Sequence, residues 1–160
     1  MASLDRLAAL AGTWLATYQL RGDPSFESDS PSTASVTPVL GGRFVRIDYT
    51  WDENDVLQEN GPQEGSLLVG HDPSTDPPET TVVWVDSWHN KDRMLISEGS
   101  LLENGGVDVR GSTPGYEGGP DWGWRTRLEP EPDGWTVTMW VITPEGEEGL
   151  AVQAEYRRRP

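Results

Sequence analysis

The chain has 160 residues, a formal net charge of −15 at pH 7 and no cysteine. Its length predicts one domain over residues 1–160, large enough for a core or a small cavity, and its charge disfavours nucleic acid and anionic membranes as partners. The lack of cysteine excludes disulfides and thiolate metal sites, and because no apolar run has the length of a secretory signal or a membrane span, we expect a cytoplasmic protein.

The first expected element is a short N-terminal helix. Apolar residues recur at helical spacing from Leu4 to Ala11. Ser3 precedes them as an N-cap residue and Gly12 ends the pattern. The rest of the chain alternates strand patterns with turns rich in Gly, Pro, Asn and Asp. We expect ten strands, which predict an antiparallel barrel or sandwich, over residues 13–21, 33–40, 43–51, 63–71, 80–89, 93–101, 106–112, 122–129, 134–142 and 148–157.

Six segments together resemble a known bacterial family. They are LAGTW (10–14), LGGRFVRIDYTW (40–51), LLVGHDP (67–73), VVWVDSWH (82–89), GPDWGWR (119–125) and TPEGEEGLAVQAEY (143–156). The set resembles the domain-of-unknown-function family numbered 1579 (DUF1579). This resemblance implies an all-β fold, a roughly ten-stranded antiparallel barrel of the calycin type, related in architecture to lipocalins, fatty-acid-binding proteins and nitrobindins. It implies no reaction, because the family has no established one.

The sequence departs from two of these relatives in ways that bear on ligands. Nitrobindin-type barrels hold haem through a histidine near the end of the last strand, and GLAVQAEYRRR (149–159) contains no histidine. We therefore expect no cofactor. Fatty-acid-binding proteins carry a helical lid after the first strand. The corresponding segment, RGDPSFESDSPS (21–32), is short and rich in Pro and Ser, so we expect no such lid.

The expected strand over residues 80–89 carries the main candidate site. Trp84, Asp86 and Trp88 share one face, and we assign that face to the barrel interior. Asp86 would then be a general base or a ligand anchor, or else a structural aspartate held by indole N–H groups or backbone amides. His89 has the opposite parity, so it approaches Asp86 only if the strand bends at its end.

Two further groups are weaker candidates. Glu98 shares parity with Met94, which makes it a second interior carboxylate that could pair with Asp86 as acid and base. His71 and His89 each end a strand, and solvent-exposed histidines at the barrel rim are the ordinary interpretation of both. Their spacing matches no recognised metal-binding pattern, so we expect no metal site.

The sequence contains eight tryptophans, several times the usual number for its length. Such residues fill a barrel, each burying about 150–250 Å², or they line a pocket for a flat ligand, and we favour the pocket. The candidate ligand-binding residues are Trp14, Tyr18, Tyr49, Trp51, Trp84, Asp86, Trp88, Trp122, Trp124 and Trp140.

The sequence therefore predicts a protein that binds a small hydrophobic or aromatic molecule in a tryptophan-rich barrel cavity. One alternative is a cofactor-free isomerase, cyclase or lyase that uses Asp86 or His89, with Glu98, as acid and base. A second is haem binding through one of the two histidines. A third is a packed barrel that acts only as an interaction partner, and outward-facing Val83 and Val85 suggest a homodimer.

Overall fold

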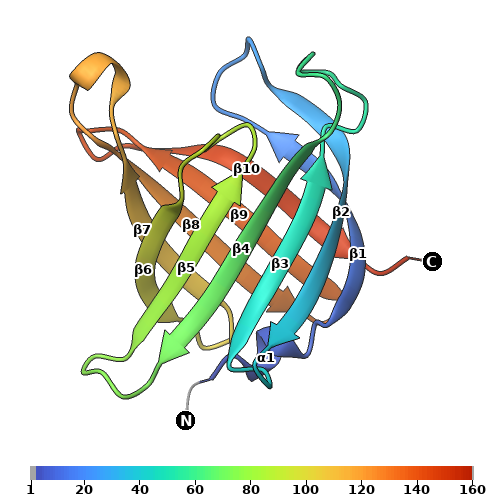
Figure 1. The fold of residues 1–160 in the computed structure, drawn as a ribbon, viewed down its shortest axis with the longest axis vertical. Coiled ribbons are helices and arrows are strands. Elements are labelled where there is room, and N and C mark those ends of the chain that lie inside the picture. The colour runs from blue at the N-terminus through green and yellow to red at the C-terminus, as the bar shows by residue number, and fades with distance from the viewer. Residues whose placement is uncertain (1–2, 160) are drawn as a thin grey trace.

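The computed structural model describes residues 3–159, whose ten strands form one closed antiparallel barrel (Figure 1). Each strand pairs with the next, and β1 pairs with β10 to close the barrel. The predicted all-β, ten-stranded architecture is confirmed. The strands are β1 (Gly12–Leu20), β2 (Ser28–Val39), β3 (Phe44–Trp51), β4 (Gln63–Asp72), β5 (Glu79–Asp86), β6 (Leu95–Leu101), β7 (Val107–Thr113), β8 (Trp122–Glu131), β9 (Gly134–Ile142) and β10 (Glu148–Arg157).

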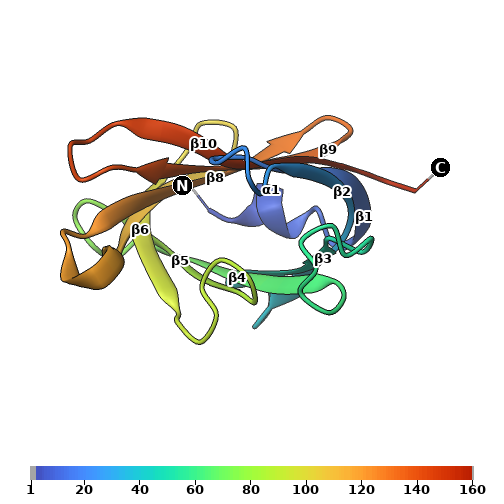
Figure 2. The same cartoon turned by 90° about the horizontal axis from the view of Figure 1, so that it is seen from above.

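One end of the barrel is closed by the short helix α1 (Asp5–Ala8). Figure 2 shows α1 between the wall formed by β8–β10 and the wall formed by β3–β5. Leu4 and Leu7 are buried there and join the core of the barrel. Within residues 3–159, no helix has the length and apolar character that crossing a membrane requires.

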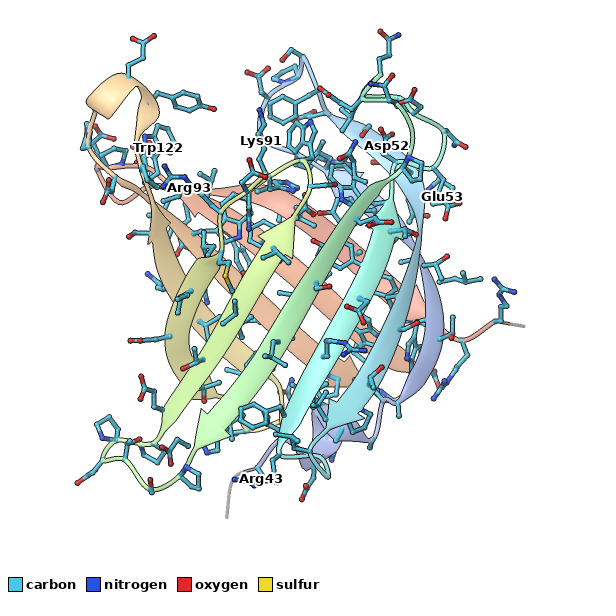
Figure 3. The ribbon with its side chains drawn as sticks, in the orientation of Figure 1. Arg43, Asp52, Glu53, Lys91, Arg93 and Trp122 are labelled. Carbon is cyan, nitrogen blue, oxygen red and sulfur yellow. The ribbon has the colours of Figure 1, made fainter. Side chains whose placement is uncertain are left out.

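The opposite end of the barrel, which we call the mouth, carries the loops that follow the odd-numbered strands (Figure 1). These loops include a 3-10 turn, η1 (Tyr116–Gly118), between β7 and β8. Lys91 and Trp122 lie at the mouth, whereas Arg43 lies at the helix end (Figure 3). The mouth is therefore the end at which side chains from several loops come together.

Below the mouth, the barrel interior is filled by aromatic side chains. Tyr18, Trp51, Trp84, Trp135 and Tyr156 are among the largest fully buried residues. The void that Tyr18, Trp135 and Tyr156 line with their neighbours has a volume of about 10 Å³, which is about the space of one water molecule. A ligand the size of an aromatic ring has no room at this level, so any larger cavity must lie nearer the mouth.

Two strand boundaries differ from the prediction by three residues or more, each for a local reason. β2 begins at Ser28 and includes Pro31, which pairs with β1. The pairing of β2 with β3 starts only at Thr33, two residues later in the chain. A proline is tolerated there because the strand has a neighbour on one side only. β5 ends at Asp86 rather than at His89, because the Asp86 carbonyl accepts two backbone N–H groups of the following turn at 3.0 Å.

Candidate functional site

The Asp86 carboxylate lies at the end of β5 and is buried, with the residue 2% exposed. Its Oδ2 accepts a hydrogen bond from the Tyr49 hydroxyl at 2.6 Å and one from Trp51 Nε1 at 3.2 Å. Its Oδ1 accepts the backbone N–H groups of Trp88 and His89, each at 2.9 Å. The side chain thus caps the turn after β5, in the manner typical of aspartate.

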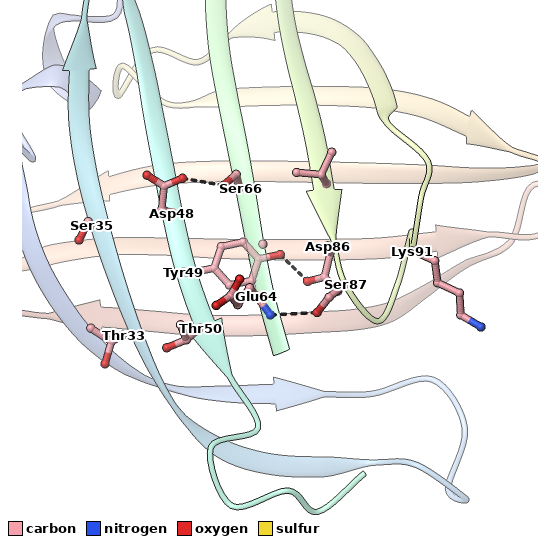
Figure 4. Close-up of a pocket in the computed structure, with 12 residues that line it drawn as sticks. Thr33, Ser35, Asp48, Tyr49, Thr50, Glu64, Ser66, Asp86, Ser87 and Lys91 are labelled. Atoms are coloured by element: carbon pink, nitrogen blue, oxygen red, sulfur yellow. Dashed lines mark hydrogen bonds between the residues drawn. The ribbon is translucent and has the colours of Figure 1, made fainter. Parts of the chain in front are cut away.

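The Tyr49 hydroxyl reaches Asp86 across an intervening strand (Figure 4). Tyr49, Gly65 and Asp86 are register partners on β3, β4 and β5. A Cβ atom on Gly65 would overlap the Tyr49 ring and hydroxyl, so the missing side chain leaves the space through which the two residues meet. The same hydroxyl accepts a hydrogen bond from Trp84 Nε1 at 2.8 Å.

Asp86 is held in its ionised form by these contacts. Burial is the largest influence and acts to raise the pKa of Asp86, but the hydrogen bonds that it accepts from His89 and Tyr49 together lower that pKa below its ordinary value. Burial and then the charge of Asp86 raise the pKa of Tyr49, which therefore stays protonated and donates.

His89 lies in the turn that follows β5, and its Nδ1 is 3.1 Å from Asp86 Oδ1. In a regular strand, His89 and Asp86 would point to opposite faces. They come into contact here because the strand ends at Asp86 and the chain bends after it. An ionised carboxylate only accepts hydrogen bonds, so the proton between the two atoms is on Nδ1. In the neutral imidazole, Nε2 is then an acceptor that points away from Asp86.

The imidazole is surrounded by indole rings and its side chain is only 7% exposed. The ring centroids of Trp51, Trp84, Trp88 and Trp124 lie 4.8–5.6 Å from that of His89. Phe26 packs edge-on against Trp88 at 5.2 Å and extends the aromatic surface toward solvent. His89 is thus both fixed by Asp86 and enclosed by four flat apolar groups.

A cleft of about 1040 Å³ opens at the mouth above this cluster, and we call it the mouth cleft. Its aromatic wall is formed by Phe26, Trp88, His89, Tyr116, Trp122 and Trp124. Charged groups of both signs stand around it, namely Arg21, Asp23, Glu59, Glu64 and Lys91. The mouth cleft therefore combines an aromatic wall with a mixed polar rim.

Two buried nitrogen atoms of residues that line the mouth cleft lack a hydrogen-bond partner among residues 3–159. They are His89 Nε2 and Trp124 Nε1, and we call them the open polar pair. Buried polar atoms in proteins are nearly always paired, so each such exception asks for an explanation. A ligand that reaches below the cleft surface and supplies one donor and one acceptor would satisfy both atoms.

The sequence-predicted site residues fall into three groups in the structure. Trp88, Trp122 and Trp124 line the mouth cleft. The second group, which belongs to the buried cluster below it, consists of Tyr18, Tyr49, Trp51, Trp84 and Asp86. Trp14 and Trp140 lie elsewhere, and each packs against arginine: Arg158 is 3.9 Å from the Trp14 ring, and Arg125 is 4.6 Å from the Trp140 ring. Trp140 lies on the outer wall.

The prediction of Glu98 as an interior carboxylate is wrong. Leu95 and Ser97 of β6 face the core, so Glu98 points outward and is exposed. The parity argument failed because two apolar residues, Ile96 of β6 and Met94 just before it, point outward and are 59% and 67% exposed. Glu98 and Asp86 therefore do not form a carboxylate pair.

The two histidines do not meet. His71 lies near the end of β4 away from the mouth and approaches Thr80 Oγ1 at 2.9 Å, whereas His89 lies in the mouth. In the described part of the chain, no group of three or more His, Asp or Glu side chains is placed to hold a metal ion.

A second concavity, of about 600 Å³, lies on the outer face of β2–β5 (Figure 4). Hydroxyl and carboxyl side chains form most of its lining, and several bond to one another. The Ser66 hydroxyl donates to Asp48 at 2.6 Å and the Ser87 hydroxyl bonds the Glu64 backbone N–H at 3.0 Å. Because several of its polar groups already bond to one another, it is a weaker candidate than the mouth cleft.

Sequence reasoning missed Gly65 and the open polar pair. Gly65 could have been noticed in the sequence, because a glycine at an inward-facing position of a strand stands where a core side chain is normally found. Nothing in the local pattern shows that the Trp124 ring lies beside His89, since the two residues meet only when the barrel closes and brings β8 near the turn after β5.

The comparisons with known proteins concern the whole chain. No curated protein matches it. The model of the family described as "Protein of unknown function (DUF1579)" matches residues 3–158, nearly the full length. This match confirms the resemblance drawn from the six segments, and the chain belongs to the DUF1579 family.

Proposed function

We propose that the protein binds one small aromatic molecule in the mouth cleft, with its ring against Trp88, Trp122 and Trp124. The observation that carries this proposal is the buried His89 Nε2, which faces no partner among residues 3–159 although Asp86 fixes the ring below an aromatic wall. A ligand hydroxyl or N–H group would donate to that nitrogen.

The size and shape of the mouth cleft support a flat ligand. Small-molecule sites usually have volumes of about 300–1,000 Å³, with mostly apolar walls and a few polar groups. The mouth cleft, at about 1040 Å³, is just above that range and opens to solvent. The packed interior below it limits how deeply a ligand enters, so the ligand would lie across the mouth.

The charges support a ligand that is neutral or cationic. The rim has three carboxylates and two cationic side chains, and the whole chain carries a net charge of −15. Such a field repels anions and lowers their concentration near the mouth cleft. The ionised Asp86 below the aromatic wall acts in the same direction.

Calorimetric titration with indole, 2-naphthol and naphthalene tests the proposal. Indole and 2-naphthol carry a donor for His89 Nε2, and naphthalene does not. A net hydrogen bond of about 1 kcal/mol corresponds to roughly fivefold tighter binding. We therefore expect the two donor-bearing compounds to bind about fivefold more tightly than naphthalene.

A pair of matched tryptophan variants locates the site. Trp122→Ala removes a wall of the mouth cleft and should weaken binding by about three- to tenfold, the value of one aromatic contact. Trp140→Ala removes an indole from the outer wall and should leave binding unchanged. Equal losses in both variants, or no saturable binding by any of the three compounds, would contradict the proposal.

A further inference from the structure

We propose that the mouth cleft is a proton-transfer site in which His89 Nε2 is the base and Trp124 Nε1–H stabilises an enolate oxygen. The substrate class is a small aromatic or conjugated ketone with an acidic C–H group beside its carbonyl. This inference rests on the proposed function, because the ketone must first bind in the mouth cleft.

His89 has the arrangement that a neutral base requires. Its Nδ1 proton is held by Asp86 at 3.1 Å, so the lone pair of the neutral ring is on Nε2. When Nε2 takes up a proton, the adjacent carboxylate stabilises the imidazolium that forms. The four indole rings around the imidazole have centroids within 5.6 Å of its own, a distance at which a ring face attracts a cation.

Asp86 is a positioning residue and not the base. Its Oδ1 accepts three donors, from Trp88 N and from His89 N and Nδ1, and its Oδ2 accepts two, from Tyr49 and Trp51. A carboxylate with this many contacts is a weak base. The geometry therefore assigns the exchangeable proton to His89.

Trp124 supplies the complementary group. An indole N–H only donates, and Trp124 Nε1 is the buried donor of the open polar pair, on a ring whose centroid is 5.6 Å from that of His89. Enolisation needs a base at the carbon and a donor at the oxygen of the same carbonyl compound. The open polar pair provides one of each in a site partly shielded from water.

The proton-transfer step is balanced without any co-reactant. His89 Nε2 takes the proton from the α-carbon, and the electrons of that C–H bond form a C=C bond. The carbonyl π electrons move to oxygen, which Trp124 Nε1–H stabilises. Return of the proton to the same carbon gives exchange with solvent, and return to the γ-carbon of a β,γ-unsaturated ketone gives its conjugated isomer.

The test measures exchange of the α-protons of 2-tetralone with deuterium in D₂O by NMR. General base catalysis typically contributes about 10²–10⁴-fold, so we expect exchange at least 100-fold faster with the protein than in buffer. His89→Gln should reduce the rate to that of buffer, and Trp124→Phe should reduce it by about 10²-fold, the value of one oxyanion donor. His71→Gln, at the far end of the barrel, should change nothing.

Binding of 2-tetralone, measured by saturation-transfer NMR in the same samples, separates the two proposals. Binding with exchange no faster than in buffer would overturn the proton-transfer role and leave the proposed function standing. Failure of 2-tetralone and of the three compounds named above to bind would overturn both. A circular dichroism melt of each variant shows whether it is folded.

The tautomer of the His89 ring can be measured without replacing His89 itself. In His71→Gln protein, His89 is the one histidine, and ¹⁵N NMR should show the proton of the neutral ring on Nδ1. Asp86→Asn can donate from its amide to Nδ1, so it should shift the proton to Nε2 and reduce exchange in parallel. A ring that carries its proton on Nε2 in the presence of Asp86 would overturn the assignment.

Discussion

The Asp86 carboxylate and the His89 imidazole lie 3.1 Å apart, although a regular strand would turn them to opposite faces. They meet because β5 ends at Asp86 and the following turn folds back over this residue, with the backbone N–H groups of Asn90 and Lys91 donating to its carbonyl. The same carboxylate forms that turn and orients the imidazole. A change at Asp86 should therefore affect both the fold of the mouth and the chemistry of His89.

Tyr49→Phe should destabilise the protein by about 2–3 kcal/mol. The change removes the 2.6 Å hydrogen bond to an ionised carboxylate and leaves Trp84 Nε1 without its acceptor, and hydrogen bonds to charged groups contribute about 1.5–3 kcal/mol. Urea unfolding measures the loss. Tyr116→Phe, at a tyrosine that is 89% exposed, is the matched control and should have a free energy of unfolding equal to that of the wild type. A similar loss in both variants would contradict the role of Tyr49.

Gly65→Ala should be destabilising although alanine favours a strand no less than glycine does. The added methyl group overlaps the Tyr49 ring and hydroxyl, and overpacking of this kind costs about 1–3 kcal/mol. Gly149→Ala is the control, because its Cβ would make an ordinary contact of 3.8 Å with Val141. If Gly65→Ala unfolded at the same urea concentration as Gly149→Ala, the space between Tyr49 and Asp86 would not need a glycine.

The barrel and the inward position of Trp84 and Asp86 could be predicted from the sequence. Alternation with a period of two fixes a face, and turn residues at regular spacing separate the strands. The same rule failed at Glu98, because Met94 and Ile96 on the outer face made that face resemble a core. The two-residue period shows which side chains share a face of a strand. Which of the two faces is buried has to be judged from the residue types on each face, and at β6 those types were misleading.

The mouth cleft could not be predicted, because it depends on where strands end. Extending β5 to His89 placed Trp88 beside Asp86 on one face and His89 on the other. In the structure the turn begins at Asp86, and Trp88 and His89 both line the mouth cleft from the loop that follows β5. The partnership of His89 with Trp124 joins β8 to the turn after β5, a long-range contact that follows from barrel closure.

Asp108→Asn should weaken the outer wall in a salt-dependent way. Asp108 accepts paired hydrogen bonds from Arg125 and from Arg127 at 2.7–3.1 Å. Burial raises the pKa of Asp108, but these two arginines outweigh it and lower that pKa. We expect a loss of about 1 kcal/mol at low salt that shrinks at 1 M salt. Asp29→Asn, whose carboxylate is 53% exposed beside Arg21, should be neutral in the same urea titration. Salt-independent losses would point to packing instead of charge.

Asp86→Asn should destabilise the protein at neutral pH and reduce the dependence of its stability on acid. The pKa of Asp86 is lowered in the folded state, whereas in the unfolded chain it is about 3.9. The unfolded state therefore binds more protons as the pH falls, so the contribution of Asp86 is complete above about pH 5 and is lost as the pH falls through the folded-state pKa.

At pH 7, replacing one member of this buried network should cost about 2–4 kcal/mol. Urea titrations of both proteins at several pH values between 7 and 3 give the difference in their free energies of unfolding. That difference should narrow as the pH falls below about 4, where the Asp86 carboxylate of the unfolded chain takes up its proton. Asp108 and Glu131, whose pKa values are also lowered, are present in both proteins and cancel in the comparison. A difference that stays constant down to pH 3 would show that folding leaves the pKa of Asp86 unchanged.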